Sequence, residues 1–136
     1  MRRLLCVSLA AVATYSCNGC FVAQGGQSCN EPGALVCGGD LGNGDTEVLL
    51  CNTVSVYSRE GSCPKSCDHV TGIRTAVGCG DSSIRAVQGS RCDGTGGACT
   101  MDLSGVMVCT NAVWTVQNSC GSQKCALKPG NVLGCQ

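Results

Sequence analysis

Alternation of apolar and polar residues predicts a β-hairpin near the end of the chain. Residues 105–109 and 113–117 are rich in β-forming residues and flank the turn Thr110-Asn111-Ala112. The second run divides between two faces: Val113, Thr115 and Gln117 against Trp114 and Val116. A weaker version of the same hairpin covers residues 47–51 and 54–58. Short apolar runs at 75–77 and 132–133 are candidates for a third strand in each half, and no stretch shows helical periodicity.

The cysteines repeat in register with this pattern. The first set of six is Cys29, Cys37, Cys51, Cys63, Cys67 and Cys79, and the second is Cys92, Cys99, Cys109, Cys120, Cys125 and Cys135. Other residues recur with them: Val48-Leu49-Leu50-Cys51 matches Val106-Met107-Val108-Cys109, and Tyr57 and Trp114 each lie six residues before the fourth cysteine. Recurrence of apolar, aromatic and glycine positions predicts two copies of one disulfide-rich β module, each a hairpin or three-stranded sheet with long loops.

Composition explains why such modules need covalent support. With 3% aromatic residues and 20 glycines, the 136-residue chain has little bulk to fill a conventional core. Closing a loop of tens of residues with a disulfide contributes roughly 3–4 kcal/mol in the chain-entropy model, so three bridges can decide whether a small module folds. Disulfides require an oxidising compartment. Six cysteines allow 15 pairings within each module, and the spacing does not choose among them.

The first residues predict export. Arg2-Arg3 precede an apolar stretch from Leu4 to Ala13 that is too short to span a bilayer, as in a secretory signal peptide. We assign residues 1–23 to the signal, 24–80 to the first module, 81–88 to a linker or joining strand, and 89–136 to the second module. Cleavage after Ser16 would retain Cys17 and Cys20. Glycine clusters at 38–45 and 93–97 predict surface turns.

Charge argues against a nucleic-acid partner. The chain carries nine basic and nine acidic residues, and two of the basic ones lie in the predicted signal peptide, so no basic patch is left for a phosphate backbone. We also expect no membrane partner and a secreted protein, extracellular or in the cell wall.

Neither a metal site nor a catalytic site is predicted. Cys63-x3-Cys67 followed by His69 lacks the paired short spacings typical of zinc sites. Asp40, Asp45 and Glu47 do not follow a calcium-loop pattern. His69, the only histidine, adjoins Asp68, but no serine or cysteine is singled out as a nucleophile. We therefore expect a non-enzymatic protein without a cofactor.

Trp114 and Tyr57 leave two interpretations open. Each aromatic side chain could be an exposed platform on which a sugar ring stacks, or it could be the one large core residue of its module. Under the first interpretation Asn111, Thr115 and Gln117 would supply polar contacts to the same ligand.

At these residues the second module resembles a known family. The run from Cys99 through Val106-Met107-Val108-Cys109-Thr110-Asn111 to Trp114, followed by Cys120, Cys125 and Cys135, is similar to the family-19 carbohydrate-binding modules. These are small chitin-binding domains of fungal chitinases and other secreted fungal proteins. The resemblance covers about forty residues, and extends more faintly to the first module, where Tyr57 replaces the tryptophan. It implies binding of chitin or a related cell-wall polysaccharide. The alternative is a secreted cysteine-rich effector, toxin or inhibitor that contacts an extracellular protein through residues 38–45 or 68–75.

Overall fold

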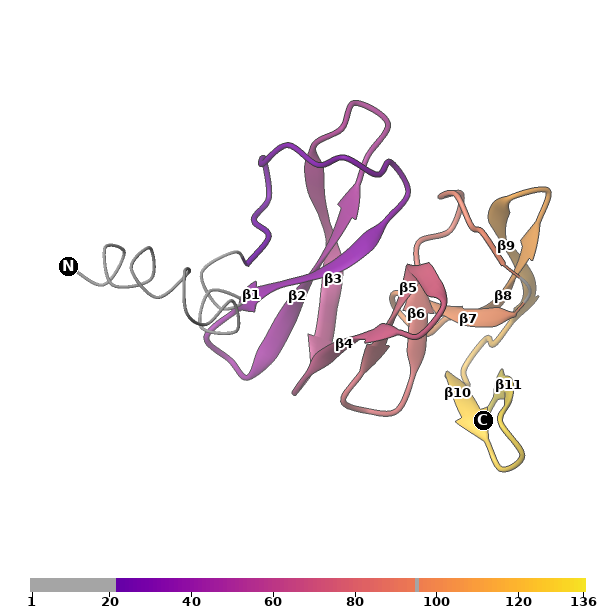
Figure 1. Ribbon diagram of the computed structural model, residues 1–136. Coiled ribbons are helices and arrows are strands. Elements are labelled where there is room, and N and C mark those ends of the chain that lie inside the picture. The colour runs from indigo at the N-terminus through magenta and orange to yellow at the C-terminus, as the bar shows by residue number, and fades with distance from the viewer. Residues whose placement is uncertain (1–21, 95) are drawn as a thin grey trace.

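The computed structural model describes residues 22–94 and 96–136, which form eleven strands and no helix (Figure 1). The predicted class, a small disulfide-rich β protein, is confirmed. Nearly all of the predicted signal peptide lies outside the described residues, together with Cys6, Cys17 and Cys20. No helix of the described part is long and apolar enough to cross a membrane.

The first half, residues 24–80, begins with an antiparallel sheet of strands β1 (Leu35–Asp40), β2 (Asp45–Cys51) and β3 (Tyr57–Pro64). The predicted hairpin is present, but its second strand starts at Tyr57 rather than at Val54. Asn52 explains the difference, because its Oδ1 accepts hydrogen bonds from the N–H groups of Val54 and Val56, at 3.1 and 3.0 Å. These bonds favour a tight turn over an extended strand.

A six-stranded sheet then links the first half to the second half, residues 89–136. Its order is β4 (Cys67–Val70), β5 (Ile73–Cys79), β6 (Ile84–Ala86), β7 (Gly97–Thr100), β8 (Gly105–Thr110) and β9 (Val113–Ser119). The hairpin predicted around residues 110–112 is confirmed as β8 and β9. Strands β10 (Cys125–Lys128) and β11 (Val132–Cys135) form a separate two-stranded sheet.

The two runs proposed as third strands are strands, but neither joins the hairpin of its half. Residues 75–77 lie in β5, which pairs with β4 and β6, and residues 132–133 lie in β11, which pairs with β10. The segment at 81–88 contains β6, which pairs antiparallel with β5 and parallel with β7. Of the two possibilities for this segment, the structure therefore shows a joining strand.

The glycine cluster at 38–45 is only partly a turn. Gly38 and Gly39 belong to β1, Asp45 begins β2, and the turn itself is confined to residues 41–44. Asp40 Oδ1 accepts a hydrogen bond from the Gly42 N–H, and Gly42 has φ of 86°. A residue with a Cβ would be strained in that conformation, so glycine permits the reversal.

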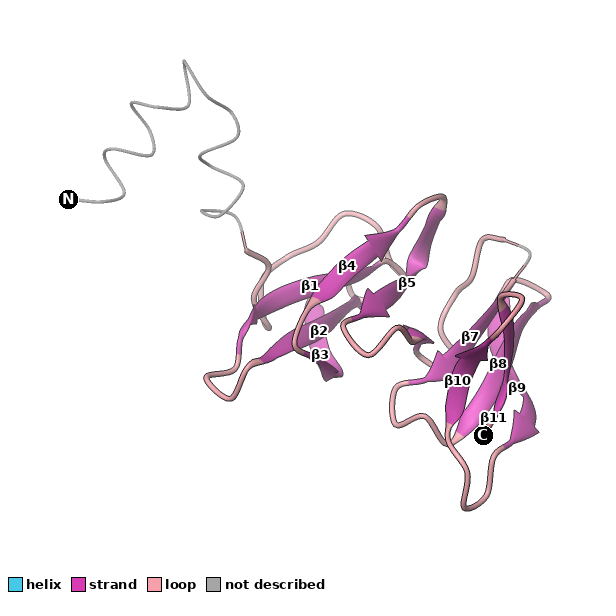
Figure 2. Cartoon of the chain, turned by 90° about the horizontal axis from the view of Figure 1, so that it is seen from below, coloured by secondary structure: helices cyan, strands magenta, loops and turns pink. Residues whose placement is uncertain are grey.

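All twelve cysteines of the two predicted modules are paired, as expected. The bonds in the first half are Cys29–Cys51, Cys37–Cys67 and Cys63–Cys79, and those in the second are Cys92–Cys109, Cys99–Cys125 and Cys120–Cys135. In each half the first cysteine pairs with the third, the second with the fifth, and the fourth with the sixth. The second bond ties the first half's β1 to β4, which run side by side in Figure 2 without pairing.

The main core lies between the halves. Ala76 of β5 and Ala86 of β6 are fully buried against Met107 and Trp114 of the second half. A second cluster joins Leu35 and Val77 of the first half, with Met101 packed against it. The halves therefore share buried surface as well as a sheet.

Candidate functional site

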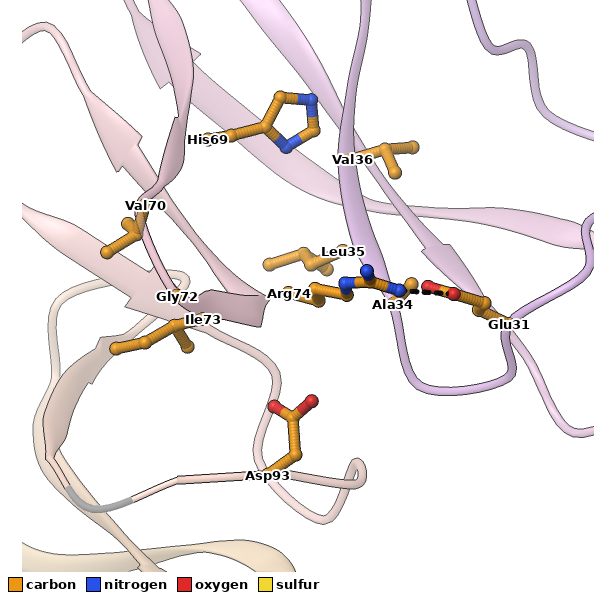
Figure 3. Close-up of a pocket in the computed structure, with 10 residues that line it drawn as sticks. All are labelled: Glu31, Ala34, Leu35, Val36, His69, Val70, Gly72, Ile73, Arg74 and Asp93. Carbon is orange, nitrogen blue, oxygen red and sulfur yellow. Dashed lines mark hydrogen bonds and ion pairs between the residues drawn. The ribbon is translucent and has the colours of Figure 1, made fainter.

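A cleft of about 520 Å³ opens on the first half, between the start of β1 and the β4–β5 hairpin (Figure 3). Aliphatic side chains form its inner surface: Leu35, Val36, Val70 and Ile73. Four residues with polar or charged side chains also line it: Glu31, His69, Arg74 and Asp93. Asp93 belongs to the second half, so the cleft depends on how the halves are joined. Residues 69–74 fall inside the interval 68–75 that was proposed as a contact surface.

Covalent and buried contacts fix the walls of this cleft. The Cys37–Cys67 bond holds β1 beside β4 with a Cα–Cα distance of 5.7 Å. On the other side, the Trp114 indole donates a hydrogen bond to the main-chain oxygen of Thr75 at 3.1 Å, and the Thr75 hydroxyl donates to Asp93 at 3.4 Å. Walls held by buried groups are preorganised, which lowers the entropic cost of binding a partner.

Charges of both signs surround the opening. Arg74 forms an ion pair with Glu31 across the cleft, but both side chains are more than half exposed. Such a pair contributes little to stability because water screens it. A smaller hollow of about 250 Å³ shares Glu31, Arg74 and Asp93 and continues to Arg91. Because the Arg74–Glu31 pair is exposed to water, a ligand can break it and bind either side chain with little loss of stability.

His69 and Asp68 do not form a catalytic pair. Both are exposed residues of β4, and neighbouring residues of a strand point to opposite faces. His69 lies at the mouth of the cleft in Figure 3. Within the described residues, no group of three or more histidine, cysteine, aspartate or glutamate side chains could hold a metal ion.

Trp114 is a core residue, so of its two interpretations the structure supports the core and not the exposed sugar platform. Only 2% of its surface is exposed, and it packs with Ala76 and Met107 in the core between the halves. Its indole N–H is already engaged by Thr75. The physical reason is the scarcity of bulky residues. Because few side chains here can fill a core, burying the largest apolar one is favourable. A sugar ring cannot stack on this face of the native protein.

The other predicted contact residues are more accessible but are not all together. Asn111, Thr115 and Gln117 are exposed on the turn and outer face of β9. Tyr57 is half-buried at the start of β3, in a different sheet. The structure thus separates the tyrosine from the three polar residues that were expected to work with an aromatic platform.

A buried arginine was missed from the sequence. Arg85 of β6 is 6% exposed and binds both halves: its guanidinium donates to the main-chain oxygens of Ser62 and Met101 and to the side chains of Asp81 and Ser83. Partial burial alone would raise the pKa of Asp81, but hydrogen bonds from Ser83 and Arg85 outweigh it and lower that pKa. The one signal available was an arginine between apolar residues in a segment that could be a strand.

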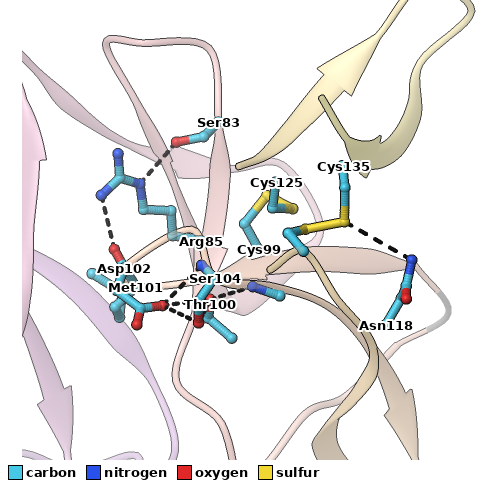
Figure 4. The surroundings of a disulfide bond; sticks show 12 residues. Ser83, Arg85, Cys99, Thr100, Met101, Asp102, Ser104, Asn118, Cys125 and Cys135 are labelled. Carbon is cyan, nitrogen blue, oxygen red and sulfur yellow. Dashed lines mark hydrogen bonds between the residues drawn. A yellow bond between two sulfur atoms is a disulfide. The ribbon is translucent and has the colours of Figure 1, made fainter. Parts of the chain in front are cut away.

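A second carboxylate organises the turn between β7 and β8. Asp102 accepts hydrogen bonds from the hydroxyls of Ser104 and Thr100, each at 2.7 Å, and from the Ser104 N–H at 3.0 Å (Figure 4). These bonds lower its pKa to about 2, with the Ser104 hydroxyl as the largest cause. The Asp102 carboxylate therefore stabilises the turn that follows β7, the strand that carries Cys99.

No family model, curated protein or solved structure matches the chain.

Proposed function

We propose that this is a secreted, non-enzymatic protein that binds an extracellular protein target through the cleft described above. The observation that carries the proposal is the cleft itself, which combines an aliphatic inner surface with four polar or charged side chains on rigid walls. Protein partners commonly present this combination, an apolar side chain that enters a pocket and polar groups around it. The site occupies the segment from His69 to Arg74, one of the two that the sequence offered as a contact surface.

The lining supports a protein target more than a neutral polysaccharide. Recognition of uncharged sugar rings relies on an exposed aromatic face, and no phenylalanine, tyrosine or tryptophan lines the cleft. Four charged residues, Glu31, Arg74, Arg91 and Asp93, line the two hollows instead. Such charges match the side chains and main-chain dipoles of a peptide segment. They set orientation and association rate more than raw affinity.

The disulfides support an extracellular setting. Six bonds among the described residues are typical of extracellular proteins, since thiols are kept reduced in the cytosol. The signal peptide predicted over residues 1–23 provides the route. Secretion into the surroundings or the cell wall is part of the proposal.

Panning a library of random linear peptides displayed on phage against the folded protein tests the cleft directly. We expect enriched peptides whose binding falls at least about tenfold with Arg74→Glu, because the substitution reverses the charge beside Glu31. Lys124→Glu is the matched control, since Lys124 is exposed and does not line the cleft. Enriched peptides that bind both variants as they bind the native protein would show that the cleft is not the site.

A second candidate, binding of chitin or a related polysaccharide, is favoured by the exposed polar residues on the outer face of β9. Thr115 and Gln117 lie on it with Val113, which is 39% exposed, and Asn111 adjoins them in the turn. Sedimentation with colloidal chitin tests this candidate. Loss of retention on Gln117→Ala, with the near-ultraviolet circular dichroism of Trp114 unchanged, would support it. Tyr57→Ala measures whether the half-buried tyrosine contributes.

A further inference from the structure

The two halves share hydrogen bonds as well as disulfide order. Gly26 and Gly89 each donate to the main-chain oxygen of an aromatic residue, Tyr57 in the first half and Trp114 in the second. Each aromatic N–H donates in turn to the residue after that glycine, and Tyr57 and Trp114 each pair with the third cysteine of their half. Tyr57 and Trp114 therefore occupy equivalent positions.

Their environments differ because of the neighbouring half. Trp114 is covered by β5 of the first half, where Ala76 is fully buried against it. Tyr57 stands at the same place on the first half and is only half-buried. We call the half-buried surface at Tyr57 the head.

The opposite end of the chain shows the complementary imbalance. Cys79 and Cys135 are equivalent, so Ala76 corresponds to Val132 and β5 corresponds to β11. Ala76 is 0% exposed, whereas Val132 is 61% exposed. Its neighbour Leu133 turns toward its own half, near Gly97, and alternation along the strand therefore directs Val132 outward. Strand β5 also pairs with β6 along one edge, while β11 pairs only with β10 among the described residues. We call the surface at Val132 and the outer edge of β11 the tail.

We propose that the head of one copy docks on the tail of a second copy, repeating between molecules the contact that joins the two halves. Tyr57 would take the place of Trp114, and Val132 the place of Ala76. We take the occupant to be a second copy because the face that covers Trp114 within the chain, at Ala76, has its equivalent at Val132 of the same chain. A contact between different surfaces is heterologous, so it generates open chains or rings rather than two-fold symmetric dimers.

Sedimentation velocity of the folded protein over a wide concentration range tests the proposal, with two single variants. Val132→Asp disables the tail and leaves the head intact, while Tyr57→Glu disables the head and leaves the tail intact. We expect each alone to associate about thirtyfold or more weakly than the native chain, because docking would bury an unpaired carboxylate. A mixture of the two variants should form one-to-one dimers and nothing larger, since only one head and one tail remain functional.

Val54→Asp is the matched control. Val54 is 74% exposed and apolar, but the corresponding turn of the second half, at Asn111 and Ala112, is exposed and makes no part of the core between the halves. Near-ultraviolet circular dichroism of Trp114 checks that each variant is folded, and Tyr57→Ala replaces Tyr57→Glu if the latter is not. A protein that stays monomeric at all concentrations overturns the proposal. So does association that Val132→Asp leaves unchanged, or a variant mixture no larger than either variant alone, which would assign the head to a different partner.

Discussion

Replacing Trp114 distinguishes its role in the core from a role in sugar binding. In the structure the indole is 2% exposed, touches both halves and donates one hydrogen bond to Thr75. Trp114→Ala removes nearly all of that packing and leaves a cavity between the halves. Truncation of a buried tryptophan costs about 3–5 kcal/mol. We expect a loss in this range, which corresponds to a factor of more than about 100 in the folding equilibrium.

A second variant separates packing from hydrogen bonding. Trp114→Phe keeps an aromatic ring in the core but leaves the Thr75 carbonyl without its donor, and Thr75 is only 4% exposed. An unsatisfied buried acceptor costs about 1–3 kcal/mol. Trp114→Phe should therefore fall between the native protein and Trp114→Ala. Tyr57→Ala, at the equivalent but half-buried position, should cost less than Trp114→Ala because less surface is lost.

Urea unfolding at low protein concentration, with all disulfides intact, measures these differences. Trp114 is the only tryptophan. Its fluorescence follows unfolding of the native protein and of Tyr57→Ala, and circular dichroism follows the two Trp114 variants. In the native protein the emission should be blue-shifted and resist quenching by iodide until the chain unfolds. A tryptophan quenched freely in the folded state, or a Trp114→Ala variant destabilised by less than about 1 kcal/mol, would refute the placement of this residue in the core.

The remaining predictions concern the supports of the core and the order of the disulfides. Arg85→Met should destabilise the protein by about 1–3 kcal/mol in urea unfolding, because the carbonyls of Ser62 and Met101 lose a donor while Asp81 stays accessible to water; Arg91→Met, on the exposed side of the cleft, is the control. The pKa of Asp102 is about 2 in the folded state against 3.8 ordinarily. Its contribution to stability is therefore present above pH 3.8 and lost as the pH falls through 2. Carboxyl NMR shifts should show that midpoint, and Asp102→Ala should remove this part of the acid dependence. Mass spectrometry of a non-reducing digest should yield the first–third, second–fifth and fourth–sixth pairing in both halves; any other pairing contradicts the fold.

Local patterns predicted the hairpins well and the sheets poorly. The β8–β9 hairpin followed from alternation around Thr110-Asn111-Ala112, since a hairpin depends on neighbouring residues alone. The pairing of β5 with β6 and of β6 with β7 depends on where the first half meets the second, and no local rule encodes that contact. Strand β1 was hidden because Gly38 and Gly39 resemble a turn. In the structure Gly38 lies against Glu47 and Leu49 of β2, where the atoms of a larger side chain would collide.

The candidate site was predictable in part for the same reason. The sequence proposes the interval 68–75 as a contact surface, and five of its residues line the cleft: His69, Val70, Gly72, Ile73 and Arg74. Asp93 and Glu31 were not associated with it, because they come from segments distant in sequence that meet only after the halves pack. The sequence leaves both interpretations of Trp114 open. The structure decides between them because strand β5 of the first half covers this residue, and the sequence of the second half alone does not contain that contact.

This dependence between the halves changes what the repeat means physically. Two modules of the predicted kind would each fold on their own disulfides, yet the largest side chain of the second half is buried only when Ala76 of the first half covers it. The guanidinium of Arg85 likewise needs Ser62 from one half and Met101 from the other. Each half has two faces that a neighbour can cover, one at Tyr57 or Trp114 and one at Ala76 or Val132. Joining the halves covers Trp114 with Ala76 and leaves Tyr57 and Val132 uncovered at the ends. In a stacked repeat the terminal units usually carry polar residues on their outer faces. Here the two outer positions are Tyr57 and Val132, and neither is charged. The exposed ends are therefore the consequence of the same packing that makes the centre of the molecule stable.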